Sequence, residues 1–294
     1  MKNGFFYIAF LCMASVFFGC NEQEKTGSLG ETELYFNERL SSISADGDSA
    51  FWIGSEAGDI WYMKQRSFQS YNIGADRIYK VVTDSVLADG KLCWVGIRNS
   101  GLQKWKLNEE ETSLEEICAI PNKGTNYSVY DILLVGKSLY VATSQGLYSM
   151  PRSGGKELKL VYPSEDSETA HSGKPFIVNN IRRYGPKCLL CATQEGLVRI
   201  SLTNGKVSLS HAGEPVYTVS VYDNKVYLLA RKKLYVEDVK GNVLHEVDLK
   251  FSPRIYYKLG SIHYFIDDNH LLLSDDLKSF LSVPLRRKVP QFCN

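Results

Sequence analysis

A repeated pattern constrains the fold of this chain more than any other feature of its sequence. Each copy contains an aromatic or apolar pair, a small residue, a short polar turn and a second apolar pair, with a glycine before that second pair in the first four copies. Successive copies begin 42, 46, 50, 37 and 37 residues apart, at Trp52, Trp94, Tyr140, Leu190, Tyr227 and Tyr264. A period of about 40 residues with short β-type runs is typical of the blades of a β-propeller.

The third copy indicates how many strands one unit contains. Runs rich in β-branched and aromatic residues at 129–135, 139–143, 146–150 and 157–161 predict four strands. Gly146 falls between the second and third runs, in a hairpin turn where glycine adopts a positive φ without strain. No long stretch has the 3.6-residue period of a helix.

We therefore predict an all-β fold, a β-propeller of six blades with four antiparallel strands each. A seventh blade is less favoured because it would need about another 40 residues. Leu34-Tyr35-Phe36 is predicted to add an outer strand that closes the ring. The propeller domain is expected to cover residues 33–294.

The motifs Trp52-Ile-Gly-Ser-x-x-Gly and Tyr140-Val-Ala-Thr-x-x-Gly-Leu-Tyr, with Val129-Tyr-Asp-Ile upstream of the second, resemble the two-component regulator propeller repeat. That repeat forms the periplasmic sensor propellers of hybrid histidine kinases, especially in Bacteroidetes. The resemblance covers about residues 40–280 and implies a sensing or binding role. Because the sequence has no kinase pattern, no DNA-binding pattern and no membrane helix after residue 19, direct signalling as a sensor kinase is not expected.

The N-terminus predicts export and lipid attachment. Residues 1–19 have a short basic start and an apolar run too short to span a bilayer, as in a secretory signal peptide. The end of this run, Phe17-Phe18-Gly19-Cys20, resembles a lipobox, which implies cleavage before Cys20 and lipidation of its thiol. The alternative is an ordinary signal peptide with an incidental cysteine. Residues 20–32 are then a polar tether.

These N-terminal features predict an envelope location, most simply at the outer membrane, on its periplasmic face or on the cell surface. The expected partners are a membrane, through the lipid, and an unknown glycan, peptide or protein. Removal of residues 1–19 takes away one lysine, so the mature chain has 33 basic and 33 acidic residues (34 − 1 against 33). This balance gives no electrostatic reason to expect nucleic acid as a partner.

No chemical motif stands out in the sequence. The five histidines have no metal-ligand spacing, and there is no nucleophile elbow or P-loop. Cys188 and Cys191 look like a CxxC pair, but residues three apart on a strand point to opposite faces, so we expect buried free thiols. We predict no cofactor, no metal and no catalytic residue. Residues far apart in the sequence can still converge in a propeller without leaving a local motif.

The start of the first strand in each blade is the predicted ligand site, because in a four-stranded blade this strand begins beside the central channel. Tyrosine recurs at this position, and its flat apolar face with a hydroxyl suits stacking on a sugar or peptide. Packing between blades is the alternative role of these tyrosines. The predicted channel-mouth residues are Arg77, Tyr79, Tyr130, Asn180, Tyr217, Arg254 and Tyr256. The connections Pro163 to Pro175 and Pro121 to Tyr127 are expected on the same face.

Three functional hypotheses follow. The leading one is a non-catalytic binding or sensing module for a glycan, peptide or partner protein. The second is an envelope enzyme, such as a glycan lyase or hydrolase, on the same scaffold. The third is a structural interaction protein. A mouth with tyrosines and amides favours the first, and converging His, Tyr, Arg and carboxylate groups favour the second.

Overall fold

The computed structural model describes residues 39–284, apart from 48–49, 65–66, 109, 164–175 and 268–269. The predicted signal peptide, Cys20, the tether, the Leu34–Phe36 strand and nearly all of the Pro163–Pro175 connection lie outside the described residues. Within the described part of the chain, every regular element is a β-strand and there is no helix. No helix that could cross a membrane is found in that part either.

The strands form six sheets of four antiparallel strands, which confirms the predicted fold. The first three blades contain β1 (Leu40–Ala45), β2 (Ala50–Ser55), β3 (Asp59–Lys64), β4 (Ser67–Asn72); β5 (Ile78–Leu87), β6 (Gly90–Ile97), β7 (Gly101–Leu107), β8 (Ser113–Cys118); and β9 (Val129–Val135), β10 (Ser138–Thr143), β11 (Gly146–Pro151), β12 (Lys159–Tyr162). The last three contain β13 (Val178–Tyr184), β14 (Cys188–Thr193), β15 (Gly196–Ser201), β16 (Val207–Ser210); β17 (Val216–Tyr222), β18 (Lys225–Ala230), β19 (Lys233–Glu237), β20 (Val243–Asp248); and β21 (Ile255–Leu259), β22 (Ile262–Ile266), β23 (His270–Ser274), β24 (Leu281–Pro284).

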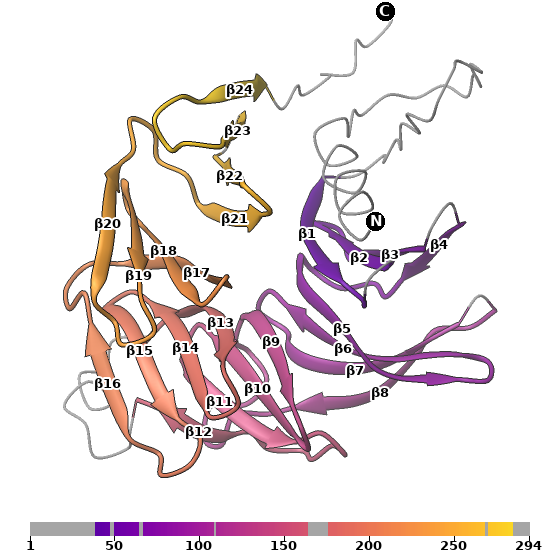
Figure 1. The fold of residues 1–294 in the computed structure, drawn as a ribbon. Helices are drawn as coiled ribbons and strands as arrows, with labels where there is room; N and C mark the ends of the chain where they lie inside the picture. The colour runs from indigo at the N-terminus through magenta and orange to yellow at the C-terminus, as the bar shows by residue number, and fades with distance from the viewer. Residues whose placement is uncertain are drawn as a thin grey trace, which may run out of the picture.

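The first strand of every blade is the inner strand of the ring (Figure 1). Extensive contacts join β1 to β5, β5 to β9, β9 to β13, β13 to β17 and β17 to β21. The described residues provide no comparably extensive contact between β21 and β1, and Figure 1 shows these two strands apart. The blades therefore pack mainly in chain order around the centre.

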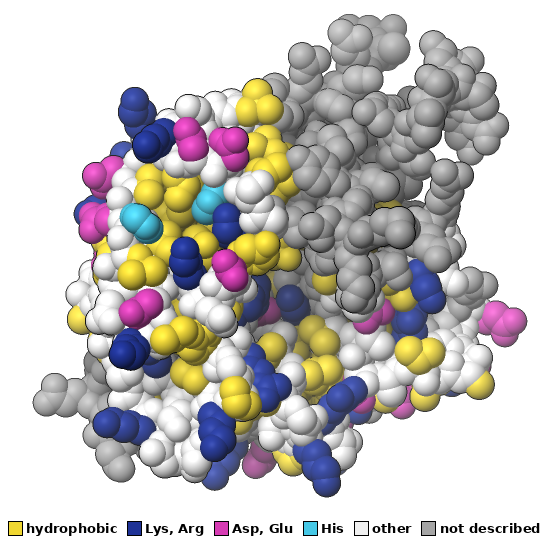
Figure 2. Space-filling model, viewed as in Figure 1, with side chains coloured by type: hydrophobic (Ala, Val, Ile, Leu, Met, Phe, Trp, Pro, Cys, Tyr) yellow, Lys and Arg dark blue, Asp and Glu magenta, His cyan; other side chains and the backbone are white. Residues whose placement is uncertain are grey.

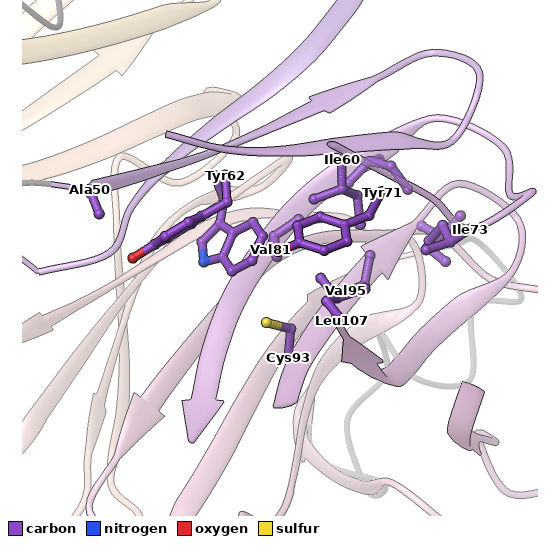
Figure 3. Close-up of a cluster of buried hydrophobic side chains, with 12 residues drawn as sticks. Ala50, Ile60, Tyr62, Tyr71, Ile73, Val81, Cys93, Val95 and Leu107 are labelled. Carbon is purple, nitrogen blue, oxygen red and sulfur yellow. The ribbon is translucent and has the colours of Figure 1, made fainter. Parts of the chain in front are cut away.

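The apolar core lies between neighbouring blades. Figure 3 shows the cluster between blades 1 and 2, where apolar side chains of both sheets meet. Trp52 in this cluster is buried, its ring centroid lies 4.6 Å from that of Tyr62, and its indole N–H donates to Thr83 Oγ1 at 2.9 Å. The indole is therefore both packed and hydrogen-bonded, as a buried tryptophan requires.

Two glycines in the second strands let blades approach closely. A Cβ at Gly54 would lie 2.7 Å from Ile78 Cβ, and one at Gly96 would lie 2.6 Å from Val129 Cγ1. Side chains of any size at these positions would push the next inner strand away. The small residue of the repeat thus sets the spacing between the first three blades.

The two cysteines of the CxxC pair lie on opposite faces of β14, as predicted. Cys191 belongs to the cluster shared with blade 3, whereas Cys188 packs against the cluster shared with blade 5. Both thiols are free. Burial raises the pKa of Cys191 well above its ordinary value, which keeps this thiol protonated and unreactive.

Candidate ligand site at the channel mouth

A β-bulge recurs near the start of the inner strands. In β5 the pairing skips from Ile78 to Lys80, so Tyr79 has no cross-strand partner. The same step occurs in four other inner strands, and the unpaired residues are Ser41, Tyr130, Asn179 and Tyr217. A bulge re-aims the side chain of its extra residue. Each of the first five blades thus has one unpaired, bulged residue near the start of its inner strand.

Blades 2 and 3 bring two of these bulged tyrosines together. The rings of Tyr79 and Tyr130 meet edge to face, with centroids 5.2 Å apart, and Arg77 lies 5.9 Å from the Tyr79 ring centroid. Both tyrosines are half-buried. Burial, followed by the neighbouring Tyr79, raises the pKa of Tyr130, so its hydroxyl stays protonated and available to donate or accept. Three predicted mouth residues therefore form one cluster.

Charged side chains surround this tyrosine pair. Glu56, which follows β2, accepts a hydrogen bond from Arg77 Nη2 and lies 3.5 Å from Arg39 Nε. Arg98 pairs more loosely with Asp76 at 3.9 Å. The ion pair with Glu56 holds Arg77 beside the Tyr79 ring, where a guanidinium favours the aromatic face. The rim of blades 1 and 2 is thus both aromatic and charged.

Asn180, the predicted mouth residue of blade 4, lies one residue past the bulge. Its Nδ2 donates to Asp131 Oδ2 at 2.7 Å, and its Oδ1 accepts from the backbone N–H of Val219 at 3.2 Å. It therefore bridges blades 3, 4 and 5 inside the channel. The bulged residue of this blade is Asn179, whose Nδ2 donates to Val216 O at 2.8 Å.

Asp131 is the centre of a set of contacts that the sequence pattern did not predict. Its side chain is only 4 % exposed and accepts from Arg182 Nη1 at 2.8 Å and from the backbone N–H of Ile181 at 3.0 Å, while Lys80 Nζ lies 3.2 Å away. We call Lys80, Asp131, Asn180 and Arg182 the channel network. It links the inner strands of blades 2, 3 and 4.

The charge state of Asp131 follows from these contacts. Burial alone would raise the pKa of this carboxyl, but the positive charges of Lys80 and Arg182 and the Ile181 N–H outweigh it. The pKa of Asp131 is therefore held below its ordinary value, and the group is ionised at neutral pH. The channel network contains two cations and one anion.

The remaining predicted residues lie apart from this cluster. Tyr217 occupies the bulge of β17 and packs against the core between blades 5 and 6. Arg254 precedes β21, its side chain is exposed, and its backbone N–H donates to Ile266 O at 2.9 Å. No contact joins either residue to the Tyr79–Tyr130 pair among the described residues. The aromatic cluster of the mouth is therefore confined to blades 2 and 3.

Tyr256 is not at the mouth surface, contrary to our expectation. It is 2 % exposed, packs in the core between blades 5 and 6, and its hydroxyl lies 2.8 Å from His263 Nδ1. The reason is register: β21 pairs regularly from Ile255 onward and has no bulge. Tyr256 pairs with Phe265 as Val219 pairs with Leu228 in the preceding blade, so it takes a core position.

Figure 2 shows Lys and Arg side chains around the hollow at the centre of the ring, interspersed with apolar ones. This arrangement can position an aromatic or sugar ring on the tyrosines and an acidic group near the cations. The part of the chain that the structure describes holds no group of three or more His, Cys, Asp or Glu side chains able to bind a metal. The second predicted loop, from Pro121 to Tyr127, ends on a buried tyrosine whose hydroxyl donates to Cys118 O at 2.9 Å.

Comparison with known proteins supports the fold. The chain is similar to the extracellular domain of the putative hybrid two component system BT3049 from B. thetaiotaomicron, with 18% identity and a TM-score of 0.61 over 86% of this chain and 36% of that one. The corresponding domain of BT4673 from the same organism gives 17% identity and a TM-score of 0.59, over 86% and 34%. The chain thus spans about a third of the length of these sensor domains.

Other propellers are similar to a comparable degree. Dihydro-heme d1 dehydrogenase NirN matches with 14% identity and a TM-score of 0.58, over 86% of this chain and 57% of that protein. No family model and no curated protein matches the sequence. At these identities the comparisons show the propeller fold, which two-component sensors share with proteins of other activities.

Proposed function

We propose that this protein is a lipid-anchored binding or sensing module of the cell envelope, and that its ligand docks at the channel mouth of blades 2 and 3. The observation that carries the proposal is the edge-to-face pair of Tyr79 and Tyr130, contributed by two different blades, with Arg77 beside it. Two half-buried aromatic faces with a fixed guanidinium suit a flat, hydroxyl-rich or amide-rich ligand, such as a glycan or peptide.

The structural similarity to extracellular domains of two-component systems supports a sensing role, because those propellers have the same blade architecture. The predicted lipid on Cys20 would hold the propeller at a membrane without any contribution from the fold. A ligand bound at the mouth would then be retained at the envelope or presented to a second protein.

The mouth is tested by binding measurements on the purified protein against glycan and peptide arrays. We expect the double variant Tyr79→Ala with Tyr130→Ala to weaken binding of any ligand found by about ten-fold or more. Tyr222→Ala is the matched control, because this partly exposed tyrosine ends the inner strand of blade 5, at the far end from the mouth. Equal binding by both variants would refute the mouth as the site.

The anchor is tested separately. Mass spectrometry of the protein purified from membranes should find an acylated N-terminal peptide beginning at Cys20. Cys20→Ser should release the protein from the membrane fraction. An unmodified Cys20 in membrane-derived protein would contradict the lipid anchor but not the ligand site.

A further inference from the structure

The channel network leaves part of one guanidinium unused. Arg182 Nη1 donates to Asp131 Oδ2 at 2.8 Å and to the carbonyl of its neighbour Ile181 at 2.7 Å, which uses both hydrogens of that nitrogen. An arginine has five N–H donors, so three remain on Nε and Nη2. Among the described residues, none accepts a hydrogen bond from these two atoms, and the Arg182 side chain is 37% exposed.

Arg182 lies among the inner strands that surround the channel. Arg182 lies on the inner strand of blade 4 and reaches Asp131 on blade 3. Its charge also acts on Tyr257 of blade 6. Burial raises the pKa of Tyr257, and the nearby Arg182 guanidinium partly opposes that rise. A side chain close to both blade 3 and blade 6 projects into the space that the ring encloses.

The charge around this edge is positive. Lys80 and Arg182 oppose the single carboxylate of Asp131. The Lys80 side chain is 21% exposed, and Asp131 is its only described ion-pair partner. A channel with low-dielectric walls concentrates such an excess of charge. The planar fork of a guanidinium matches two oxygens of a carboxylate, sulfate or phosphate group.

The channel network is next to the tyrosine pair along the same two inner strands. Lys80 follows Tyr79 on β5, and Asp131 follows Tyr130 on β9. One residue along a strand advances about 3.3 Å. A ligand that rests on the two rings therefore reaches the network with a short substituent.

We propose that the central channel contains an oxyanion site, in which Arg182 and Lys80, the two cations paired with Asp131, bind a carboxylate, sulfate or phosphate group. The proposal deepens the proposed function and rests on it in one respect: the oxyanion is the acidic group of the ligand that the mouth binds. The ligand class is thereby narrowed to anionic glycans or peptides.

The site is tested with inorganic sulfate as the probe, by calorimetric titration of the purified protein at constant ionic strength with chloride as the balancing anion. We expect saturable sulfate binding that Arg182→Gln weakens about ten-fold, the effect of one lost charged hydrogen-bonding partner. Arg183→Gln is the matched control, because the neighbouring Arg183 donates to Gly185 O and Pro186 O at the end of the same strand. This variant should bind sulfate as the unaltered protein does.

Asp131→Asn provides a change in the opposite direction. It removes the only carboxylate of the network and keeps an oxygen that can accept from Ile181 N–H, so sulfate should bind several-fold more tightly. A purely structural network would predict loss of stability in both variants and no change in sulfate affinity. Circular dichroism checks that each variant folds. If Arg182→Gln does not fold, the sulfate affinity of Asp131→Asn alone tests the oxyanion site.

The outcomes separate the two proposals. No saturable sulfate binding, equal affinity in Arg182→Gln and Arg183→Gln, or unchanged or weaker binding by Asp131→Asn would overturn the oxyanion site and leave the mouth proposal standing. The Tyr79→Ala, Tyr130→Ala double variant should still bind sulfate. Acetate and phosphate titrations identify which oxyanion geometry the site prefers.

Discussion

Blades 3 and 6 begin with similar sequences and use their tyrosines in opposite ways. Val129-Tyr130 starts β9 and Ile255-Tyr256 starts β21. In β9 a bulge leaves Tyr130 unpaired and half-buried beside Tyr79, and the next residue, Asp131, belongs to the channel network. In β21 there is no bulge, and Tyr256 is buried against blade 5. The comparison teaches that strand register, more than residue type, decides which tyrosines a ligand can reach.

The largest effect is expected on the blade 3 side of this comparison, from Asp131→Ala. The change removes the carboxylate but leaves Lys80, Arg182 and the N–H of Ile181 without their acceptor. Breaking a buried ion pair from one side should lower the free energy of unfolding by about 5 kcal/mol. Urea denaturation measures it.

Asp89→Ala is the control for that experiment, because the exposed Asp89 carboxylate accepts a hydrogen bond from Lys106 Nζ at 2.7 Å. Exposed ion pairs contribute little to stability. Similar destabilisation by both variants would show that the channel network has no special role in the fold.

The blade 6 side is tested by Tyr256→Ala. Loss of a buried ring and of the hydrogen-bond partner of His263 should destabilise the protein by about 4 kcal/mol. Tyr130→Ala should be mild in comparison. Its effect on the free energy of unfolding should exceed that of an ordinary surface substitution by less than about 1 kcal/mol. Equal losses of unfolding free energy in the two variants would contradict the difference in register between β9 and β21.

The environment of Tyr256 also predicts a pH effect. Burial, followed by the nearby Lys258 ammonium, lowers the pKa of His263 to about 4, so the folded protein keeps this imidazole neutral. An unfolded chain binds that proton near pH 6.5. Between about pH 6.5 and 4 the unfolded state therefore holds more protons, and stability falls with acidification by up to roughly 3 kcal/mol.

This pH effect is measured as the difference in denaturation free energy between pH 7 and pH 4. In His263→Gln the part due to this imidazole should disappear. His245→Gln, at an exposed position of β20, should retain it. An unchanged acid loss in His263→Gln would mean that other groups dominate the acid response.

The smallest stability effect concerns the spacing that positions blade 3. Gly96→Ala should destabilise by about 1–2 kcal/mol, because its Cβ would lie 2.6 Å from Val129 Cγ1 and 3.1 Å from Val129 O. Gly155→Ala, whose Cβ meets only Met150 Cε at 3.6 Å, is the matched control. Thermal denaturation of both variants compares them, and equal melting temperatures would contradict the close approach of blades 2 and 3.

The period of the repeat predicted the blades well because each glycine and aromatic pair recurs at a fixed place in a strand. In the third repeat the predicted strands 129–135 and 146–150 match β9 and β11 to within one residue. The burial of the predicted mouth residues was foreseen less completely, since Tyr256 lies in the core. A bulge leaves no mark in residue type, so the loss of the bulge in β21 was invisible in the pattern around Tyr256.

The channel network was missed for a different reason. Lys80, Asp131 and Arg182 lie about 50 residues apart on separate blades, and only the ring geometry brings them together. Each looks like an ordinary charged residue in a half-exposed strand. One signal was available: a charged residue such as Asp131, within an inner strand that packs between two blades, needs a partner of opposite charge.

The order in which the blades contact one another has a consequence for how the chain assembles. Each inner strand packs against the inner strand of the next blade in sequence, from β1 to β21. A chain that is delivered from its N-terminus, as in synthesis or export, can therefore add each blade onto a surface already made. Among the described residues, each new inner strand finds its main partner blade directly before it in the sequence, which limits the time for which unpaired strands are open to aggregation.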